Sequence, residues 1–114
     1  MNLKQLLVGI LLFSSVSYGQ TGYKKVYKSG EYLQDWSLVK SIAGTYGFID
    51  KSGKEVVHPI YAKIWKFGEY HENIALVKSI TGTYGFIDKT GKEVVQAIYT
   101  LEEIKQRFST LYKP

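Results

Sequence analysis

The chain has 114 residues, which limits it to one small domain. It contains no cysteine, so no disulfide can stabilise the fold if the protein is exported, and thiolate ligands for a metal are absent. The excess of 15 basic over 10 acidic residues is modest and does not give the dense basic stripe of a nucleic-acid-binding protein, so we expect no nucleic acid as a partner.

The first 19 residues have the order of a secretory signal peptide. Lys4 supplies a positive charge, Leu6–Val16 is an uncharged apolar run, and small residues occupy the −3 and −1 positions of a cleavage site before Gln20. A membrane anchor is the alternative, but a spanning helix needs about 20 apolar residues and this run is shorter. We therefore expect residues 1–19 to be removed on export to the periplasm, the cell surface or the medium, which lowers the net charge from +5 to +4. Membrane association is expected only if the segment stays uncleaved.

A repeat of 38 residues dominates the rest of the chain. Residues 23–60 align with residues 61–98 without a gap, and only two of the 20 positions in Leu38–Val57 differ in the second copy. A third copy starts at Tyr99 and diverges at once. A period of this length is typical of a stacked array of supersecondary units, so we assign residues 20–99 to one two-repeat domain.

Each repeat is predicted to be a three-stranded antiparallel β-meander, which makes the fold all-β. In the second repeat, segments rich in Val, Ile and Leu predict strands at residues 74–79, 83–88 and 92–98. The segment from 61 to 73 is predicted to be a looser aromatic connector. Gly85 lies inside the middle strand, where a glycine often marks the close approach of another backbone or of an aromatic ring.

Two tight turns are predicted in each repeat. Residues 50–53 and 88–91 begin with Asp, which opens a type I turn, and end with Gly, which suits the left-handed position of a bulge. Residues 41–44 and 79–82 follow the same logic with Ser in place of Asp. The middle strand of each repeat is therefore predicted to be shared by two successive hairpins.

Residues 100–114 change from a strand pattern to a helical one. Thr100 followed by Glu103 is a capping box, and it predicts a short amphipathic helix over residues 101–112. Its apolar residues recur at helical spacing: Leu101, Ile104, Phe108 and Leu111. The end of a repeat array exposes an apolar face that needs a cap. Two repeats form a small core, so we expect either that this helix covers that face or that the protein forms a homo-oligomer.

The sequence YGFIDKSGKEVVHPIY at residues 46–61 resembles the bacterial WG repeat, which has a Trp-Gly pair, an Asp-Lys-Thr-Gly-Lys turn, valines, and then Pro and Tyr. The resemblance covers most of both repeats and implies a stacked β-repeat fold. It implies no shared activity, because the family is defined by its repeat. This chain departs from the pattern with Tyr46 and Tyr84 in place of the tryptophan, and with Ala97 where the first repeat has Pro59.

No group of residues predicts catalysis, a cofactor or a metal site. His58 and His71 do not recur between the repeats and are interpreted as surface residues, because a metal or nucleophile site needs several convergent groups. Residues 50–55 faintly resemble a calcium loop, but two lysines oppose a cation and the turn explains the aspartate. The carboxylates that recur between the repeats are interpreted as structural, since an active site is normally single. They are Glu31, Glu69, Asp50 and Asp88.

Two sets of side chains are candidates for binding a partner. The aromatic set could stack on sugars or form a protein-binding hot spot, or it could instead be the core between the repeats. The lysine set could form a basic edge, or it could be a solvated face that protects exposed strands from pairing. The candidates are the aromatic residues Trp36, Trp65, Tyr32 and Tyr70 and the lysines Lys51, Lys54, Lys89 and Lys92.

The leading hypothesis is therefore a non-catalytic, exported repeat module for protein–protein interaction or scaffolding in the bacterial envelope or outside the cell, with an unknown protein as its partner. The alternative is a glycan- or polyanion-binding protein that uses the exposed aromatic residues and lysines, with an acidic glycan as its ligand. The two hypotheses differ in salt response, because charge-driven binding weakens with ionic strength and an apolar interface does not.

Overall fold

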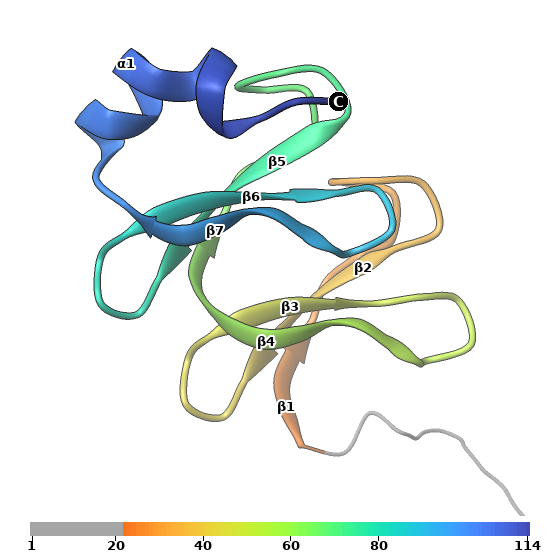
Figure 1. The fold of residues 1–114 in the computed structure, drawn as a ribbon. Helices are drawn as coiled ribbons and strands as arrows, with labels where there is room; N and C mark the ends of the chain where they lie inside the picture. Colours follow the sequence, from red (N-terminus) through yellow and green to blue (C-terminus); the bar gives the residue numbers. More distant parts are fainter. Residues whose placement is uncertain (1–21) are drawn as a thin grey trace, which may run out of the picture.

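The computed structural model describes residues 22–114 and shows one antiparallel sheet of seven strands followed by a single helix (Figure 1). Every strand pairs with the next one in the sequence, so the strand order in the sheet is the order in the chain. This confirms the predicted all-β repeat fold with a C-terminal helix. The elements are β1 (Tyr23–Val26), β2 (Ser37–Ser41), β3 (Tyr46–Ile49), β4 (Glu55–Ile64), β5 (Ile74–Ser79), β6 (Tyr84–Asp88), β7 (Glu93–Tyr99) and α1 (Leu101–Leu111).

The predicted signal peptide lies outside the described residues. Between residues 22 and 114, no helix has the length and apolar character that crossing a membrane would require.

Strand β4 joins the two repeats, which the sequence analysis did not predict. Its first part pairs with β3, and residues 61–64 at its end pair with β5. The prediction of a loose connector over residues 61–73 was therefore wrong for residues 61–64. Tyr61 and Ile64 bury their side chains in the core, and pairing with β5 holds the backbone between them extended. The array is consequently one continuous sheet rather than two meanders joined by a loop.

The tight turns confirm the roles predicted for their Asp and Gly residues. Gly53 adopts a positive φ of 86°. The carboxylate of Asp50 accepts the backbone N–H of Ser52 at 2.9 Å and that of Lys54 at 3.0 Å, and Asp88 does the same in the second repeat. The turns between β2 and β3 and between β5 and β6 likewise close on a glycine with positive φ.

Gly47 and Gly85 confirm the predicted close approach of another backbone inside the middle strand. A Cβ at Gly85 would lie 2.2 Å from the carbonyl oxygen of Val95, and a Cβ at Gly47 would lie 2.3 Å from that of Val57. At both places the register of the sheet shifts as the next strand, β4 or β7, bulges across the glycine. Only a hydrogen atom fits in the space that remains.

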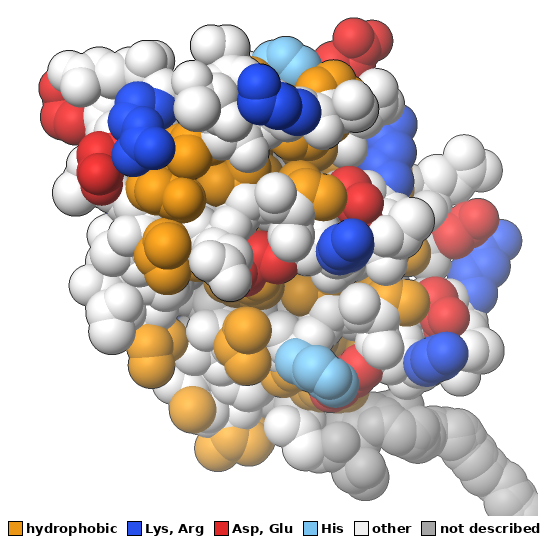
Figure 2. Space-filling view, viewed as in Figure 1, with side chains coloured by type: hydrophobic (Ala, Val, Ile, Leu, Met, Phe, Trp, Pro, Cys, Tyr) orange, Lys and Arg blue, Asp and Glu red, His pale blue; other side chains and the backbone are white. Residues whose placement is uncertain are grey.

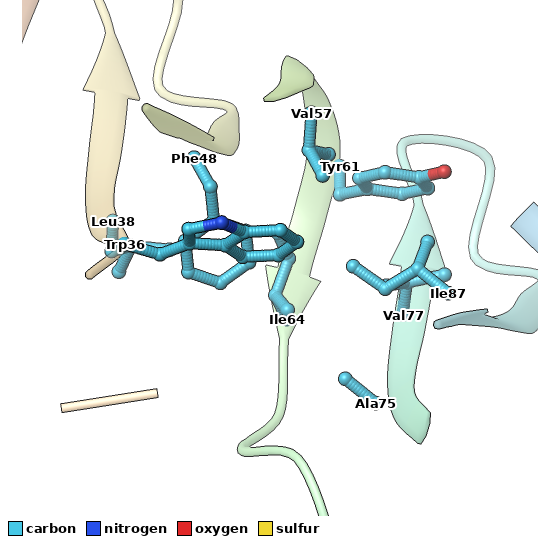
Figure 3. Close-up of a cluster of buried hydrophobic side chains, with 9 residues drawn as sticks. All are labelled: Trp36, Leu38, Phe48, Val57, Tyr61, Ile64, Ala75, Val77 and Ile87. Carbon is cyan, nitrogen blue, oxygen red and sulfur yellow. The ribbon is translucent and has the colours of Figure 1, made fainter. Parts of the chain in front are cut away.

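The core consists of two neighbouring clusters of buried side chains. The first draws its members from the residue before β2 and from β2 through β6, so it binds the two repeats together (Figure 3). The second lies between β5, β6, β7 and α1, and the fully buried Ile104 completes it. Phe108 packs against Phe86 with ring centroids 5.4 Å apart, much as Phe67 packs against Phe48 at 6.4 Å in the first cluster. Helix α1 thus takes the place that a further repeat would occupy.

The start of α1 has the predicted capping box. The Thr100 hydroxyl accepts the backbone N–H of Glu103 at 3.1 Å, and the Glu103 carboxylate accepts the backbone N–H of Thr100 at 2.9 Å. The helix ends at Leu111, one residue before the predicted end. These reciprocal bonds fix the helix start directly after β7, where the helix can fold back over the second cluster.

Candidate functional site

Trp36, a candidate for binding a partner, lies in the core. Its side chain is 9% exposed. Its ring centroid lies 5.1 Å from that of Phe48 and 5.8 Å from that of Phe67. Figure 3 shows the indole within the first cluster, beside Phe48 and Ile64. Trp36 is therefore inaccessible to a partner in this fold, and its position matches the alternative in which the aromatic residues form the core between the repeats.

Trp65 and Tyr70 lie at the end of the array that α1 covers. Trp65 is half-buried and packs against the second cluster, and the Nζ of Lys63 lies 4.4 Å from the centroid of its ring. Tyr70 is 37% exposed. Its ring centroid is 5.2 Å from that of Phe86 and 5.7 Å from that of Phe108. Tyr70 therefore contacts the helix through Phe108, and both candidate residues present only part of their surface to solvent.

Tyr32 lines a surface hollow of about 330 Å³ between the first repeat and the first strand segment of the second, residues 62–64. Tyr27 and Tyr46 provide two further aromatic walls, and Glu31 and Lys63 provide the charges. Burial, followed by the negative charge of Glu31, raises the pKa of the Tyr32 hydroxyl above its usual value, so this hydroxyl stays protonated at neutral pH. We call this hollow the tyrosine pocket. Its aromatic rings and opposite charges suit a small polar ligand with an apolar face, such as a saccharide.

The candidate lysines lie in the β3–β4 and β6–β7 turns, which project from the same side of the sheet, at the ends of the strands (Figure 1). Each turn carries two of the lysines, and acidic residues lie beside them. The Nζ of Lys51 lies 3.0 Å from the carboxylate of Asp35, and the two turns also contain Asp50 and Asp88. Figure 2 shows side chains of both signs interspersed on this side of the molecule. We call it the charged edge; its lysines are Lys51, Lys54, Lys89 and Lys92.

Four exposed isoleucines lie along the opposite side of the sheet, two in turns and two on strands. They were not among the predicted candidates. Ile42 and Ile80 are in the β2–β3 and β5–β6 turns and are 72% and 73% exposed. Ile60 on β4 and Ile98 on β7 are 57% and 60% exposed. The two turns contain only Ser, Ala, Thr, Gly and Ile, so they carry no charge. We call these four residues the isoleucine edge.

Hydrogen bonds and strand pairing set the order of these residues along the edge. Thr45, which follows the first turn, donates its hydroxyl to the carbonyl oxygen of Pro59 at 2.5 Å, and this places the turn beside β4. Tyr61 in turn pairs with Ser79, the first residue of the second turn. The Thr hydroxyl bond recurs in the second repeat at 2.6 Å. Figure 2 shows hydrophobic groups following one another on this side. The order along the edge is Ile42, Ile60, Ile80 and Ile98.

The sequence did contain signals for the isoleucine edge. Ile42 and Ile80 sit beside a turn glycine in both repeats, and a turn tip is exposed to solvent, where small polar residues are usual. Ile60 lies between Val57 and Tyr61, which are both buried. The period of two along a strand therefore places Ile60 on the outer face. A search for apolar residues at turn tips and on outward-facing strand positions would have found all four.

In each repeat, a glutamate of the last strand accepts a hydrogen bond from the tyrosine that begins the repeat. The Tyr61 hydroxyl donates to Glu93, and the Tyr23 hydroxyl donates to Glu55 at 2.5 Å. The pKa of Glu55 is lowered, first by the Tyr23 hydroxyl and then by His58, whose Nδ1 lies 2.8 Å away. Burial, together with the Glu93 carboxylate, raises the pKa of Tyr61. Each of these carboxylates joins the first and last strands of its own repeat, and the two do not converge on a common site.

Comparison with known proteins identifies the repeat. The family model of the WG containing repeat matches residues 46–79 and 84–101. The matched segments begin at Tyr46 and at Tyr84. Each of these tyrosines directly precedes a glycine that a neighbouring strand crosses. No curated protein and no solved structure matches the chain. The two matched segments, residues 46–79 and 84–101, are therefore similar to the WG containing repeat.

Proposed function

We propose that this chain is a non-catalytic, exported module that binds another protein and serves in interaction or scaffolding. The isoleucine edge carries the proposal. Four large apolar side chains, each more than half exposed, follow one another along one edge of the sheet. Water solvates such a surface poorly, and contiguous exposed apolar surface in a folded protein often marks an interaction site.

The use of the carboxylates within the fold supports a non-catalytic role. Asp50 and Asp88 accept the N–H groups of their own turns, while Glu55 and Glu93 accept the hydroxyl of the tyrosine that begins their own repeat. A general acid or base must reach the proton that it transfers to or from a substrate. These four carboxylates are instead engaged in hydrogen bonds within the turns and within each repeat.

Residues 1–19 support the proposal of export, because their order of positive, apolar and small residues is that of a signal peptide. Export would present the isoleucine edge to proteins of the periplasm, the cell surface or the medium. Mass spectrometry of the protein recovered from its own host tests this part. A mature chain that starts at Gln20 in the exported fraction supports export, and an intact Met1 in the cytosol contradicts it.

Affinity capture with matched variants tests the binding proposal. The full chain, tagged after Pro114, is cross-linked in its host and retrieved beside Ile42→Glu/Ile80→Glu, which charges the isoleucine edge. The control is Lys51→Glu/Lys89→Glu, which alters the charged edge. We expect the native chain and the control to retain the same protein through a salt wash, and the isoleucine variant to lose it. A protein retained equally by all three would contradict the proposal.

A second candidate function is saccharide binding in the tyrosine pocket, favoured by the three aromatic walls and two charges there. The charged edge favours an acidic polymer less, because aspartates lie among its lysines. Calorimetric titration with envelope saccharides tests this candidate on Glu31→Ala, with Glu69→Ala at the equivalent position of the second repeat as the control. Binding lost only in Glu31→Ala would support the candidate, and absence of heat with the native chain would rule it out.

A further inference from the structure

We infer that four lysines, each beside an aromatic ring, form a binding site for an acidic polysaccharide that lies across both repeats. The inference rests on the second candidate function, saccharide binding, and names the class of saccharide. None of these lysines belongs to the charged edge. We call the site the lysine row, and its members are Lys25, Lys40, Lys63 and Lys78.

Strand pairing places the lysines of the row in two like-charged pairs. Lys25 is the partner of Lys40 between β1 and β2, and Lys63 is the partner of Lys78 between β4 and β5. Side chains directly opposite each other in an antiparallel pair are about 5 Å apart at Cβ, and like charges there destabilise the sheet. Both repeats nevertheless keep this arrangement. An anion bound at each pair would replace the repulsion by attraction of both lysines to the ligand.

No carboxylate forms an ion pair with the row within residues 22–114. The ion pairs there involve Lys51, His58 and Arg107. Glu31 lines the same hollow as Lys63, but the two are not paired. The charged edge differs in this respect, because its Lys51 already has an aspartate as its partner. The ammonium groups of the row are therefore available to an anionic ligand.

Each ammonium group of the row lies over an aromatic ring. The Nζ of Lys25 is 4.4 Å from the ring centroid of Tyr27, and the Nζ of Lys63 is 4.4 Å from that of Trp65. The other two lysines lie 5.7 Å from the ring of the tyrosine that precedes the strand glycine. Attraction to the ring holds each charge beside an apolar plane. An acidic sugar has the matching chemistry, because its pyranose ring carries a carboxylate beside a face of C–H groups.

The spacing of the lysine pairs favours a polymer over a single sugar. The first pair is on β1 and β2 and the second is on β4 and β5, three strands further along the sheet. Neighbouring strands are about 4.8 Å apart, so the pairs are separated by ~14 Å. The tyrosine pocket joins them, because Lys63 lines it, and so do the rings beside Lys25 and Lys40. A chain of several sugars fills the pocket and also reaches both pairs.

Other polyanions match the lysine row less well. The charge of a nucleic acid lies on its backbone, several bonds away from the base that would stack on an aromatic ring. An acidic peptide has carboxylates but no ring that carries them. We therefore expect the row to prefer an acidic polysaccharide to both.

Calorimetric titration of the full chain with hexagalacturonate, an acidic oligosaccharide, tests the inference. Lys25→Gln/Lys63→Gln is compared with the control Lys51→Gln/Lys89→Gln, and each variant loses two exposed lysines. We expect the native chain and the control to bind equally, and the row variant to bind roughly tenfold more weakly or worse, because charged hydrogen bonds are lost. Maltohexaose, the neutral counterpart, should bind the native chain with a similarly large loss.

Several outcomes would overturn the inference. One is equal binding of hexagalacturonate by the native chain and the row variant. Another is binding of polyglutamate or of oligothymidylate as tightly as hexagalacturonate. Maltohexaose that binds as tightly as hexagalacturonate would overturn the inference and leave saccharide binding in the tyrosine pocket standing. Absence of heat with both sugars would overturn the two together.

Discussion

Glu55 and Glu93 occupy equivalent positions and both accept a tyrosine hydroxyl, but their other carboxylate oxygens have different partners. Glu93 accepts the backbone N–H of Ala97 at 3.1 Å. The equivalent residue in the first repeat is Pro59, which has no N–H. There the Glu55 oxygen lies 2.8 Å from the Nδ1 of His58 instead. His58 thus gives Glu55 a hydrogen-bond partner in place of the backbone N–H that Pro59 lacks, which accounts for a histidine at this position in the first repeat only.

Acid should destabilise the fold through its turn aspartates. The pKa of Asp50 is lowered, first by the hydrogen bond from the Ser52 hydroxyl. At Asp88, burial alone would raise the pKa, but hydrogen bonds from Thr90 and from two backbone N–H groups outweigh it and lower the pKa. A carboxylate with a depressed pKa in the folded state contributes stability above its unfolded pKa, and that contribution is lost as pH falls through the folded value. We therefore expect the melting temperature to fall as pH drops below about 4, near the unfolded pKa of Asp.

Circular dichroism melts between neutral and acidic pH check this expectation, with Asp88→Asn as the matched variant. Asp88→Asn should melt lower than the native chain at neutral pH, because it loses a charged acceptor in the turn. It should then lose less on acidification, because one titrating group is gone. An equal loss in both proteins would show that Asp88 does not carry the effect.

Gly85→Ala should destabilise the fold, because the new Cβ would lie 2.2 Å from the carbonyl oxygen of Val95, a backbone atom that cannot rotate away. We expect the free energy of unfolding to fall by roughly 1–3 kcal/mol, the range for overpacked sites, as measured by urea denaturation. Thr81→Ala is the control, because it copies the exposed Ala43 of the first repeat and should change little. A Gly85→Ala protein as stable as the native chain would mean that β7 does not cross the glycine closely.

At the scale of elements, the turns and most of the strands could be predicted, while the join between the repeats could not. The Asp and Gly residues of a turn act within four residues, so the sequence shows them directly. The extended path of residues 61–64 depends on β5, which follows only after the connector. Pairing at that sequence separation leaves no local pattern, and the aromatic composition of the segment suggested a connector instead.

Only part of the candidate site could be predicted, again because the sequence does not show long-range packing. The lysines are at exposed turns, where their polarity places them. An aromatic residue such as Trp36 satisfies the composition of a core and of a binding surface equally well, and only the packing of Phe48 and Phe67 around it decides.

Loss of contacts from α1 should weaken the end of the array. Ile104 is fully buried in the second cluster, and Ile104→Ala should lower the free energy of unfolding by about 2–4 kcal/mol in urea denaturation. Lys105→Ala, at an exposed position of the same helix, is the control and should stay within about 0.5 kcal/mol of the native chain. Deletion of residues 100–114 should reduce both solubility and melting temperature. Unchanged values after this deletion would contradict a capping role for the helix.

At the scale of the whole molecule, the two repeats are not independent units. They share β4, which pairs with a strand on either side, and they share the first core cluster, to which both contribute. Neither repeat alone has a closed core, since the first lacks Phe67, which packs against Phe48, and the second lacks Trp36, which packs against Phe67. Stability therefore belongs to the array.

This sharing should make unfolding a single cooperative transition. Each repeat carries one tryptophan, Trp36 in the first and Trp65 in the second, so Trp65→Phe and Trp36→Phe leave fluorescence probes of the first and second repeat. Within each variant, we expect the urea midpoint from fluorescence to coincide with the midpoint from circular dichroism. Separate midpoints would show that one repeat unfolds while the other persists.

The strictly sequential strand order also affects how the chain is made. Each strand from β2 to β7 pairs with the strand immediately before it in the sequence. The sheet can therefore grow from its N-terminal end while the rest of the chain is still emerging from a ribosome or a translocation channel. No strand waits for a distant partner, and such local pairing favours rapid folding for a β protein. Helix α1 follows the last strand, so it docks after the sheet is formed and closes the apolar end of the array.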